Sequence, residues 1–121
     1  MALTINHPTL KEQTVYAYVA DSSSTASGYT SARFRGKIVK LGVVAGAVVD
    51  SDRVITAKIN GTSITGGAIT LTASGSAVGQ VTTAVPTALN NVVEDDTIEF
   101  ATDGAGSTAC PTQYFAVIRA S

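Results

Sequence analysis

Residues 53 to 65, RVITAKINGTSIT, contain the clearest indication of the fold. Asn60-Gly61 suits the two central positions of a type I′ turn, because both positions need a positive φ, which Asn and Gly tolerate best. The register set by that turn places Ala57 opposite Ile64 and segregates apolar from polar side chains. The apolar face consists of Ile55, Ala57, Ile59 and Ile64. The stretch therefore predicts an antiparallel hairpin with one buried face.

Further strands are predicted on the C-terminal side of the hairpin. Gly66-Gly67 interrupts the ladder, and residues 68 to 72 resume it with Ile69 and Leu71 on one side. Residues 113 to 119 are apolar on both faces, as expected of a central strand between two layers. The other elements predicted here are a short irregular strand within 74–86, a turn at Asp95-Asp96, a strand over 97–101 and a glycine-rich loop over 103–108.

On the N-terminal side, residues 14 to 20 are rich in β-branched and aromatic residues and predict a first strand. Small polar residues from Asp21 to Ser31 predict a long surface loop. Residues 34 to 44 alternate, but the parity of the apolar positions changes between Ile38 and Lys40. We therefore expect either a bulge there or burial on both sides of that strand.

No window shows a sustained helical period, and seven or eight short strands at this spacing indicate a sandwich or a barrel. We favour an all-β fold, an antiparallel jelly-roll-like β-sandwich in a single domain. The domain is predicted to span residues 14 to 121, preceded by an N-terminal arm over residues 1 to 13.

The composition excludes several classes of protein. With 45% hydrophobic and 14% charged residues the chain does not match disordered proteins, so it folds. A net charge of −1 disfavours direct nucleic-acid binding, which depends on Lys and Arg displacing counterions. Neither a secretory signal nor an apolar run of about 20 residues is apparent, which predicts a cytosolic origin and no membrane partner.

Candidate chemistry is sparse. His7 is the sole histidine and lies in the arm, and Cys110 is the sole cysteine, so thiolate zinc sites and the usual catalytic zinc sets cannot be assembled. Asp50-Ser51-Asp52 begins like a calcium loop but lacks the later glycine and glutamate, so solvated turn residues are the better interpretation. We predict no enzyme activity, no metal and no cofactor.

Two features suggest contacts with other molecules. Basic residues gather in one segment and acidic residues in another, which indicates either two solvated edges or complementary patches between identical subunits. In the arm, Leu3 and Ile5 alternate with Thr4, so the arm either adds a strand to a neighbour or begins the sandwich of its own chain. The candidate contact residues are Leu3, Ile5, Arg33, Arg35, Lys37, Glu94, Asp95 and Asp96.

The run GKIVKLGVVAGAVVDSDRVITAKINGTSITGGAITLTASGSAVGQV, followed by NNVVEDDTIEF and YFAVIRAS, resembles small β-sandwich proteins of tailed bacteriophage particles. These include capsid decoration or cement proteins and head-fibre proteins, and the resemblance covers residues 34 to 119. It implies a structural virion protein, often a homotrimer, that binds the major capsid protein on the exterior of an assembled head and stabilises it. Such a particle assembles in the host cytoplasm.

The alternative is a carbohydrate-binding or receptor-binding β-sandwich module. A row of exposed aromatic side chains would favour that alternative, because aromatic rings stack on sugar rings. The candidates for such a row are Tyr16, Tyr18 and Tyr29, of which Tyr16 and Tyr18 share one face of a strand.

Overall fold

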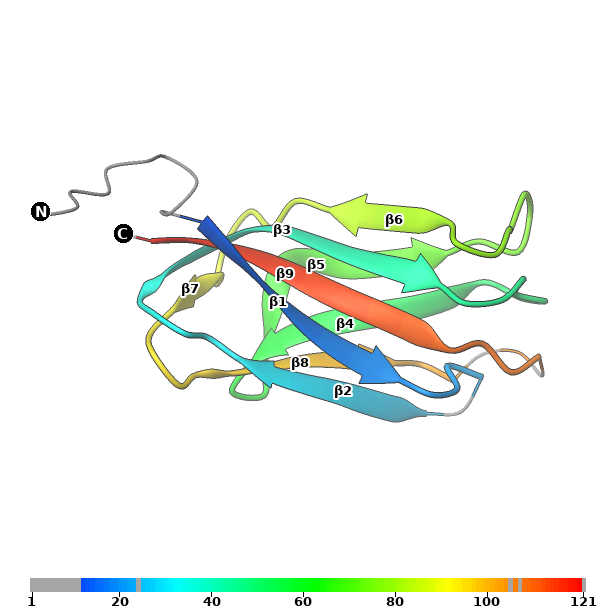
Figure 1. Ribbon diagram of the computed structural model, residues 1–121, viewed down its shortest axis with the longest axis horizontal. Coiled ribbons are helices and arrows are strands. Elements are labelled where there is room, and N and C mark those ends of the chain that lie inside the picture. Colours follow the sequence, from blue (N-terminus) through cyan, green and yellow to red (C-terminus); the bar gives the residue numbers. More distant parts are fainter. Residues whose placement is uncertain (1–11, 24, 105, 107, 121) are drawn as a thin grey trace, which may run out of the picture.

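The computed structural model describes residues 12–23, 25–104, 106 and 108–120, which form nine β-strands and no helix (Figure 1). The strands are β1 (Glu12–Val19), β2 (Ala26–Ser31), β3 (Gly36–Ala45), β4 (Arg53–Ile59), β5 (Thr62–Leu71), β6 (Val81–Ala84), β7 (Asn91–Val92), β8 (Thr97–Thr102) and β9 (Thr112–Ala120). Residues 1–11 lie outside the described residues, and with them Leu3, Ile5 and His7. Glu12 and Gln13, predicted as arm, belong to β1.

The strands form two antiparallel sheets stacked face to face (Figure 1). Sheet A has the order β1-β9-β3-β6, with β7 also paired to β3, and sheet B has the order β2-β8-β4-β5. The chain passes from sheet to sheet at most of its connections, which is the jelly-roll arrangement. The predicted fold class is confirmed. The strand predicted to lie between two layers, β9, is central in its sheet between β1 and β3, but only its inner face is covered by the other sheet, since Gln113 is exposed and Phe115 half-buried.

The hairpin of β4 and β5 forms as predicted around Asn60 and Gly61, which have φ angles of 50° and 86°. All four apolar residues of its predicted inner face are buried. The predicted pairing of Ala57 with Ile64 is wrong, because the ladder shifts register between Lys58 and Thr56. Gly66, at φ 78°, lies in the extra length of β5, so the glycine pair interrupts the ladder inside one strand rather than ending it.

The predicted bulge in β3 is present between Ile38 and Lys40, where the pairing with β9 changes register. Asn90 fills the gap in the edge beside this bulge. The Ile38 N–H donates to the carbonyl oxygen of Asn90 at 2.9 Å, and Asn90 Nδ2 donates to the carbonyl oxygen of Ile38 at 2.7 Å. The bulge therefore keeps its backbone groups bonded although β6 and β7 do not reach it.

The prediction of a loop from Asp21 to Ser31 is wrong for its second half, because residues 26 to 31 form β2 at the edge of sheet B. The free edge of β8 has backbone N–H and C=O groups that need partners. The hydrogen bonds that β2 makes to them outweigh the low strand propensity of Ser and Gly. A Cβ on Gly28 would lie 3.1 Å from the carbonyl oxygen of Tyr18. The small residues thus allow β2 to approach β1 closely at this side of the sandwich.

The core lies between the sheets and is formed by the inward residues of both. Phe100 from sheet B stacks on Tyr114 from sheet A, with ring centroids 5.0 Å apart. The Thr112 hydroxyl donates to the Tyr114 hydroxyl oxygen at 2.9 Å, so the buried phenol has a partner. Burial raises the pKa of Tyr114 above its ordinary value.

Candidate binding surfaces

Of the residues considered for catalysis or metal binding, Cys110, Asp50 and Asp52 have structural roles, and His7 lies outside the described residues. Cys110 is fully buried, and its thiol contacts the carbonyl oxygen of Ala47 at 3.6 Å. The Asp50 carboxylate pairs with Arg53 at 3.1 Å, and Asp52 accepts the N–H of Ala73 at 2.9 Å. The interpretation of Asp50 and Asp52 as turn residues is therefore favoured. Within the described ranges there is no pocket and no group of three or more His, Cys, Asp or Glu side chains arranged to hold a metal ion.

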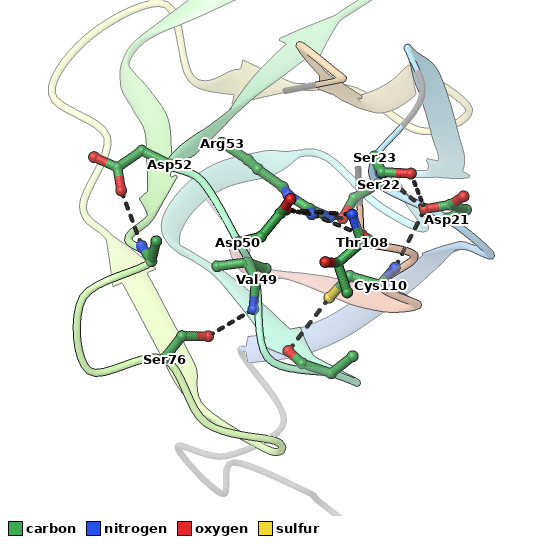
Figure 2. A network of polar contacts seen from close by, with 12 residues as sticks. Asp21, Ser22, Ser23, Val49, Asp50, Asp52, Arg53, Ser76, Thr108 and Cys110 are labelled. Carbon is green, nitrogen blue, oxygen red and sulfur yellow. Dashed lines mark hydrogen bonds and ion pairs between the residues drawn. The ribbon is translucent and has the colours of Figure 1, made fainter. Parts of the chain in front are cut away.

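Arg53 is the centre of a polar network that closes one end of the sandwich (Figure 2). Its side chain is fully buried. Nη1 donates to Ser22 Oγ at 2.7 Å, and Nη2 donates to the carbonyl oxygen of Thr108 at 2.7 Å and to Asp50. The guanidinium thereby ties together the β1–β2, β3–β4 and β8–β9 connections. A buried cation with this set of partners is a structural anchor.

Sequence reasoning missed this role, although a pattern in the sequence pointed to it. Arg53 has the same parity as Ile55, Ala57 and Ile59, so its side chain starts on the inner face of β4. Asp21 strengthens the same end by accepting the Ser23 hydroxyl at 2.7 Å, the Ser23 N–H at 2.9 Å and the Cys110 N–H at 3.2 Å. The Ser23 hydroxyl is the main reason that the pKa of Asp21 lies below its ordinary value.

The outer face of sheet A carries an exposed patch, here called the aromatic face. Its exposed members are Tyr16 and Tyr18 from β1 and Val81 from β6, and its half-buried members are Phe115 from β9 and Val44 from β3, around Gly42. In register, Tyr16 lies beside Phe115, and Phe115 lies beside Gly42. The next row runs from Tyr18 through Gln113 and Val44 to Val81. Tyr16 and Tyr18 are 59% and 60% exposed, so they project from the sheet into solvent.

The outer face of sheet B is polar by comparison. Glu99 on β8 lies beside Lys58 on β4 in register and accepts the hydroxyl of Ser27 at 2.7 Å. Tyr29 on β2 is 62% exposed, and its register neighbour is Glu99. The two faces are therefore not equivalent. Because a contiguous exposed apolar patch marks a contact surface, the aromatic face is the candidate binding surface. The three tyrosines predicted as candidates are thus all exposed, but only two of them share a face.

The structure brings the predicted basic and acidic contact segments together at one end of the sandwich, within a single copy of the chain. The Ala32 N–H donates to the carbonyl oxygen of Asp96, and the Asp95 N–H donates to that of Ala32, both at 2.9 Å. Arg33, Arg35, Lys37, Glu94 and Asp95 are exposed. Between described residues, the ion pairs are Arg53 with Asp50 and Arg119 with Glu12, so these five charges remain available for other contacts.

Asp96 differs from its acidic neighbours because its carboxylate is used within the chain. It accepts the Val93 N–H at 2.8 Å and the Asn60 side-chain amide at 2.9 Å. The Val93 hydrogen bond is the main reason that the pKa of Asp96 lies below its ordinary value. Its role as a contact residue stays a prediction, whereas its role as a structural acceptor is observed.

The fold and its faces define a jelly-roll β-sandwich with an exposed aromatic patch on one sheet. The sequence matches no protein family and no curated protein. Solved structures do share the fold. One is the carbohydrate-binding module CsCBM6-3 from Clostridium stercorarium in complex with cellobiose, at 14% identity and a TM-score of 0.55, covering 92% of this chain and 83% of that one.

A second similar structure is the catalytic unit of a GH87 α-1,3-glucanase from Streptomyces thermodiastaticus, at 11% identity and a TM-score of 0.54. The match covers 91% of this chain and 26% of the enzyme unit. At these identities the likeness establishes the fold alone. In the part of the chain that the structure describes, no helix could span a membrane.

Proposed function

We propose that this chain is a structural protein of a phage particle, a decoration or cement protein that binds the outside of an assembled head through its aromatic face. The observation that carries the proposal is that face: Tyr16, Tyr18 and Val81 lie exposed beside the half-buried Phe115 and Val44, and the described part of the chain has no pocket. The sequence resemblance over residues 34 to 119 supplies the kind of partner.

The composition of the aromatic face supports a protein partner. Tyrosine and phenylalanine are enriched in the buried centres of protein interfaces, and charged residues are depleted there. Tyr16, Tyr18, Phe115 and Val44 form such a centre. The charged residues of sheet A lie toward the end where β1 begins, at Glu12, Lys37, Lys40 and Arg119. An apolar centre with a charged rim on one side fits docking against a shell of repeated subunits.

The remaining parts of the proposal follow from the same resemblance. The partner is the major capsid protein, the site is the capsid exterior, and the decorating unit is a homotrimer. Arg33, Arg35 and Lys37, together with Glu94 and Asp95, are proposed to orient one copy against the next, because charge pairs set orientation more than affinity. Leu3 and Ile5 are proposed to add a strand to a neighbouring sheet edge.

Co-sedimentation of the purified protein with phage heads stripped of their decoration tests the proposal. We expect saturable binding with a fixed number of copies per head, together with greater resistance of the head to heat or chelation. Heads that still carry their own decoration provide the control and should bind little. The proposal would be contradicted if the protein failed to bind stripped heads of a phage whose genome encodes this chain.

A carbohydrate-binding module is the second candidate, and the fold comparison supports it better than it supports the first. The specific observation is the pair Tyr16 and Tyr18, which project from the same face of β1 at positions i and i+2 and are therefore about 7 Å apart. Rings at that spacing could stack on successive units of a sugar chain. Slower migration in gels that contain a soluble β-glucan, lost in a variant with both tyrosines replaced by serine, would favour this function.

A further inference from the structure

The Asn60 carboxamide connects the β4–β5 turn to the turn that precedes β8. Its Oδ1 accepts the Thr97 N–H at 2.9 Å, and its Nδ2 donates to Asp96 Oδ1 at 2.9 Å. The backbone N–H of Asn60 donates to the carbonyl oxygen of Thr97, also at 2.9 Å. The side chain thus extends the pairing of β4 with β8 by one position beyond the last strand pair.

The residue that follows Asn60 has no side chain that would shield its backbone nitrogen. Gly61 is exposed, and a Cβ placed on it would meet no atom within 4 Å. Glycine also has the widest conformational freedom, which favours the geometry in which its nitrogen reaches the preceding side chain. The other asparagines, Asn6, Asn90 and Asn91, are followed by residues with side chains.

We propose that Asn60 is a site of spontaneous deamidation, restrained in the folded protein by its hydrogen bonds to Asp96 and Thr97. The Gly61 nitrogen loses its proton and bonds to Asn60 Cγ, and the Cγ–Nδ2 bond breaks to release ammonia. Water then opens the cyclic imide at either carbonyl, which yields an aspartyl or an isoaspartyl residue. The reaction needs water alone and no oxidant or enzyme.

The product breaks the connection that the amide makes. A carboxylate at position 60 can still accept the Thr97 N–H but cannot donate to Asp96. Two carboxylates would then face each other over the 2.9 Å that now separates Nδ2 from Oδ1, next to the further charges of Glu94 and Asp95. Like charges at that distance repel, so deamidation releases the hairpin turn from the turn before β8.

A matched pair of variants tests the restraint. Asp96→Asn leaves one side-chain oxygen where two now accept, and with that oxygen on the Val93 N–H its NH2 group faces the Asn60 amide and cannot accept from it. Asp95→Asn removes the same charge from the neighbouring residue, for which no hydrogen bond to Asn60 is found among the described residues. After incubation of the folded proteins at mildly alkaline pH, peptide mapping should find deamidation at Asn60 about threefold to tenfold faster in Asp96→Asn than in wild type. Asp95→Asn should match wild type.

A second pair tests the consequence even if the first variant unfolds. Asn60→Asp should lower the unfolding midpoint in urea, and the swapped pair Asn60→Asp with Asp96→Asn should recover most of the loss. In the swapped pair the new amide at position 96 can donate to the new carboxylate at position 60 and accept the Val93 N–H. The proposal would be overturned if Asn60 deamidated at equal rates in Asp96→Asn and Asp95→Asn, or no faster than Asn90 and Asn91 in wild type. It would also be overturned if the swapped pair were no more stable than Asn60→Asp.

Discussion

The ring of Phe115 lies directly over Gly42, since a Cβ on that glycine would come within 2.0 Å of Phe115 Cζ. The two residues are register neighbours on β9 and β3, and both belong to the outer face of sheet A. A side chain at position 42 would therefore lift the ring from the sheet. This glycine keeps the aromatic face flat.

Replacing Gly42 by alanine is expected to lower the free energy of unfolding by about 1–3 kcal/mol, because the added methyl overlaps the ring. Urea unfolding measures the change. In a Phe115→Ala background the same substitution should cost much less, since the overlapping atoms are gone. Equal costs in the two backgrounds would show that the ring does not depend on the glycine.

Replacing Arg53 by methionine is expected to lower the free energy of unfolding by about 2–4 kcal/mol, since Ser22, Asp50 and the Thr108 carbonyl lose a buried donor. Lys58→Met is the matched control on the same strand. Its side chain lies on the outer face of sheet B, where the change should stay within about 0.5 kcal/mol. If Arg53→Met and Lys58→Met unfold at the same urea concentration, Arg53 does not anchor the three connections.

Acid is expected to destabilise the protein through Asp21 and Asp96. Hydrogen bonds, from the Ser23 side chain to Asp21 and from the Val93 N–H to Asp96, place both folded pKa values below 3.8, the ordinary value for Asp. The folded state therefore binds these protons more weakly than the unfolded state. The stability they provide is present above the unfolded pKa and is lost as pH falls through the folded values.

Urea unfolding measured from neutral pH down to strongly acidic pH checks this expectation. Asp21→Asn should reduce the loss of stability on acidification, whereas Glu94→Gln should leave it unchanged, because Glu94 is exposed and no hydrogen bond to its carboxylate is found among the described residues. The assigned pKa shifts would be contradicted if the urea midpoint of the wild-type protein stayed constant as the pH was lowered beneath 4.

Association between copies of the protein is expected to depend on the charged residues at the end of the sandwich where Arg33 and Glu94 lie. Light scattering should detect a trimer at low salt, and high salt should weaken it, because exposed charge pairs are screened. The variant with Arg33→Glu and Arg35→Glu should associate less, and restoring complementarity with Glu94→Lys and Asp95→Lys should recover part of the loss. A monomer under all conditions would contradict the proposed trimer.

The sequence was sufficient for features that depend on local chemistry. The turn at Asn60-Gly61 and the bulge near Ile38 follow from backbone preferences and from the parity of apolar residues, and both are present. The strand β2 could not be found in this way, because Ser27 and Gly28 have low strand propensity and are held by their pairing with β8.

The candidate surface was predictable only in part, for a similar reason. Tyr16 and Tyr18 share a face by their spacing alone. Their proximity to Phe115 and Gly42 depends on the register of β1, β9 and β3, three strands far apart in the sequence. Pairing between distant strands is set by the whole sandwich, and no local pattern encodes it.

The central claim is that the aromatic face of sheet A binds the partner, and one comparison of variants tests it most directly. Tyr16→Ser with Tyr18→Ser removes two exposed rings from that face, whereas Tyr29→Ser removes an equally exposed ring from β2 in sheet B. Binding of each folded variant to stripped heads is measured by co-sedimentation across a concentration series. We expect the double variant to bind at least about tenfold more weakly, which corresponds to about 1.4 kcal/mol, and Tyr29→Ser to bind like wild type. Unchanged binding by the double variant, or an equal loss in Tyr29→Ser, would contradict the claim.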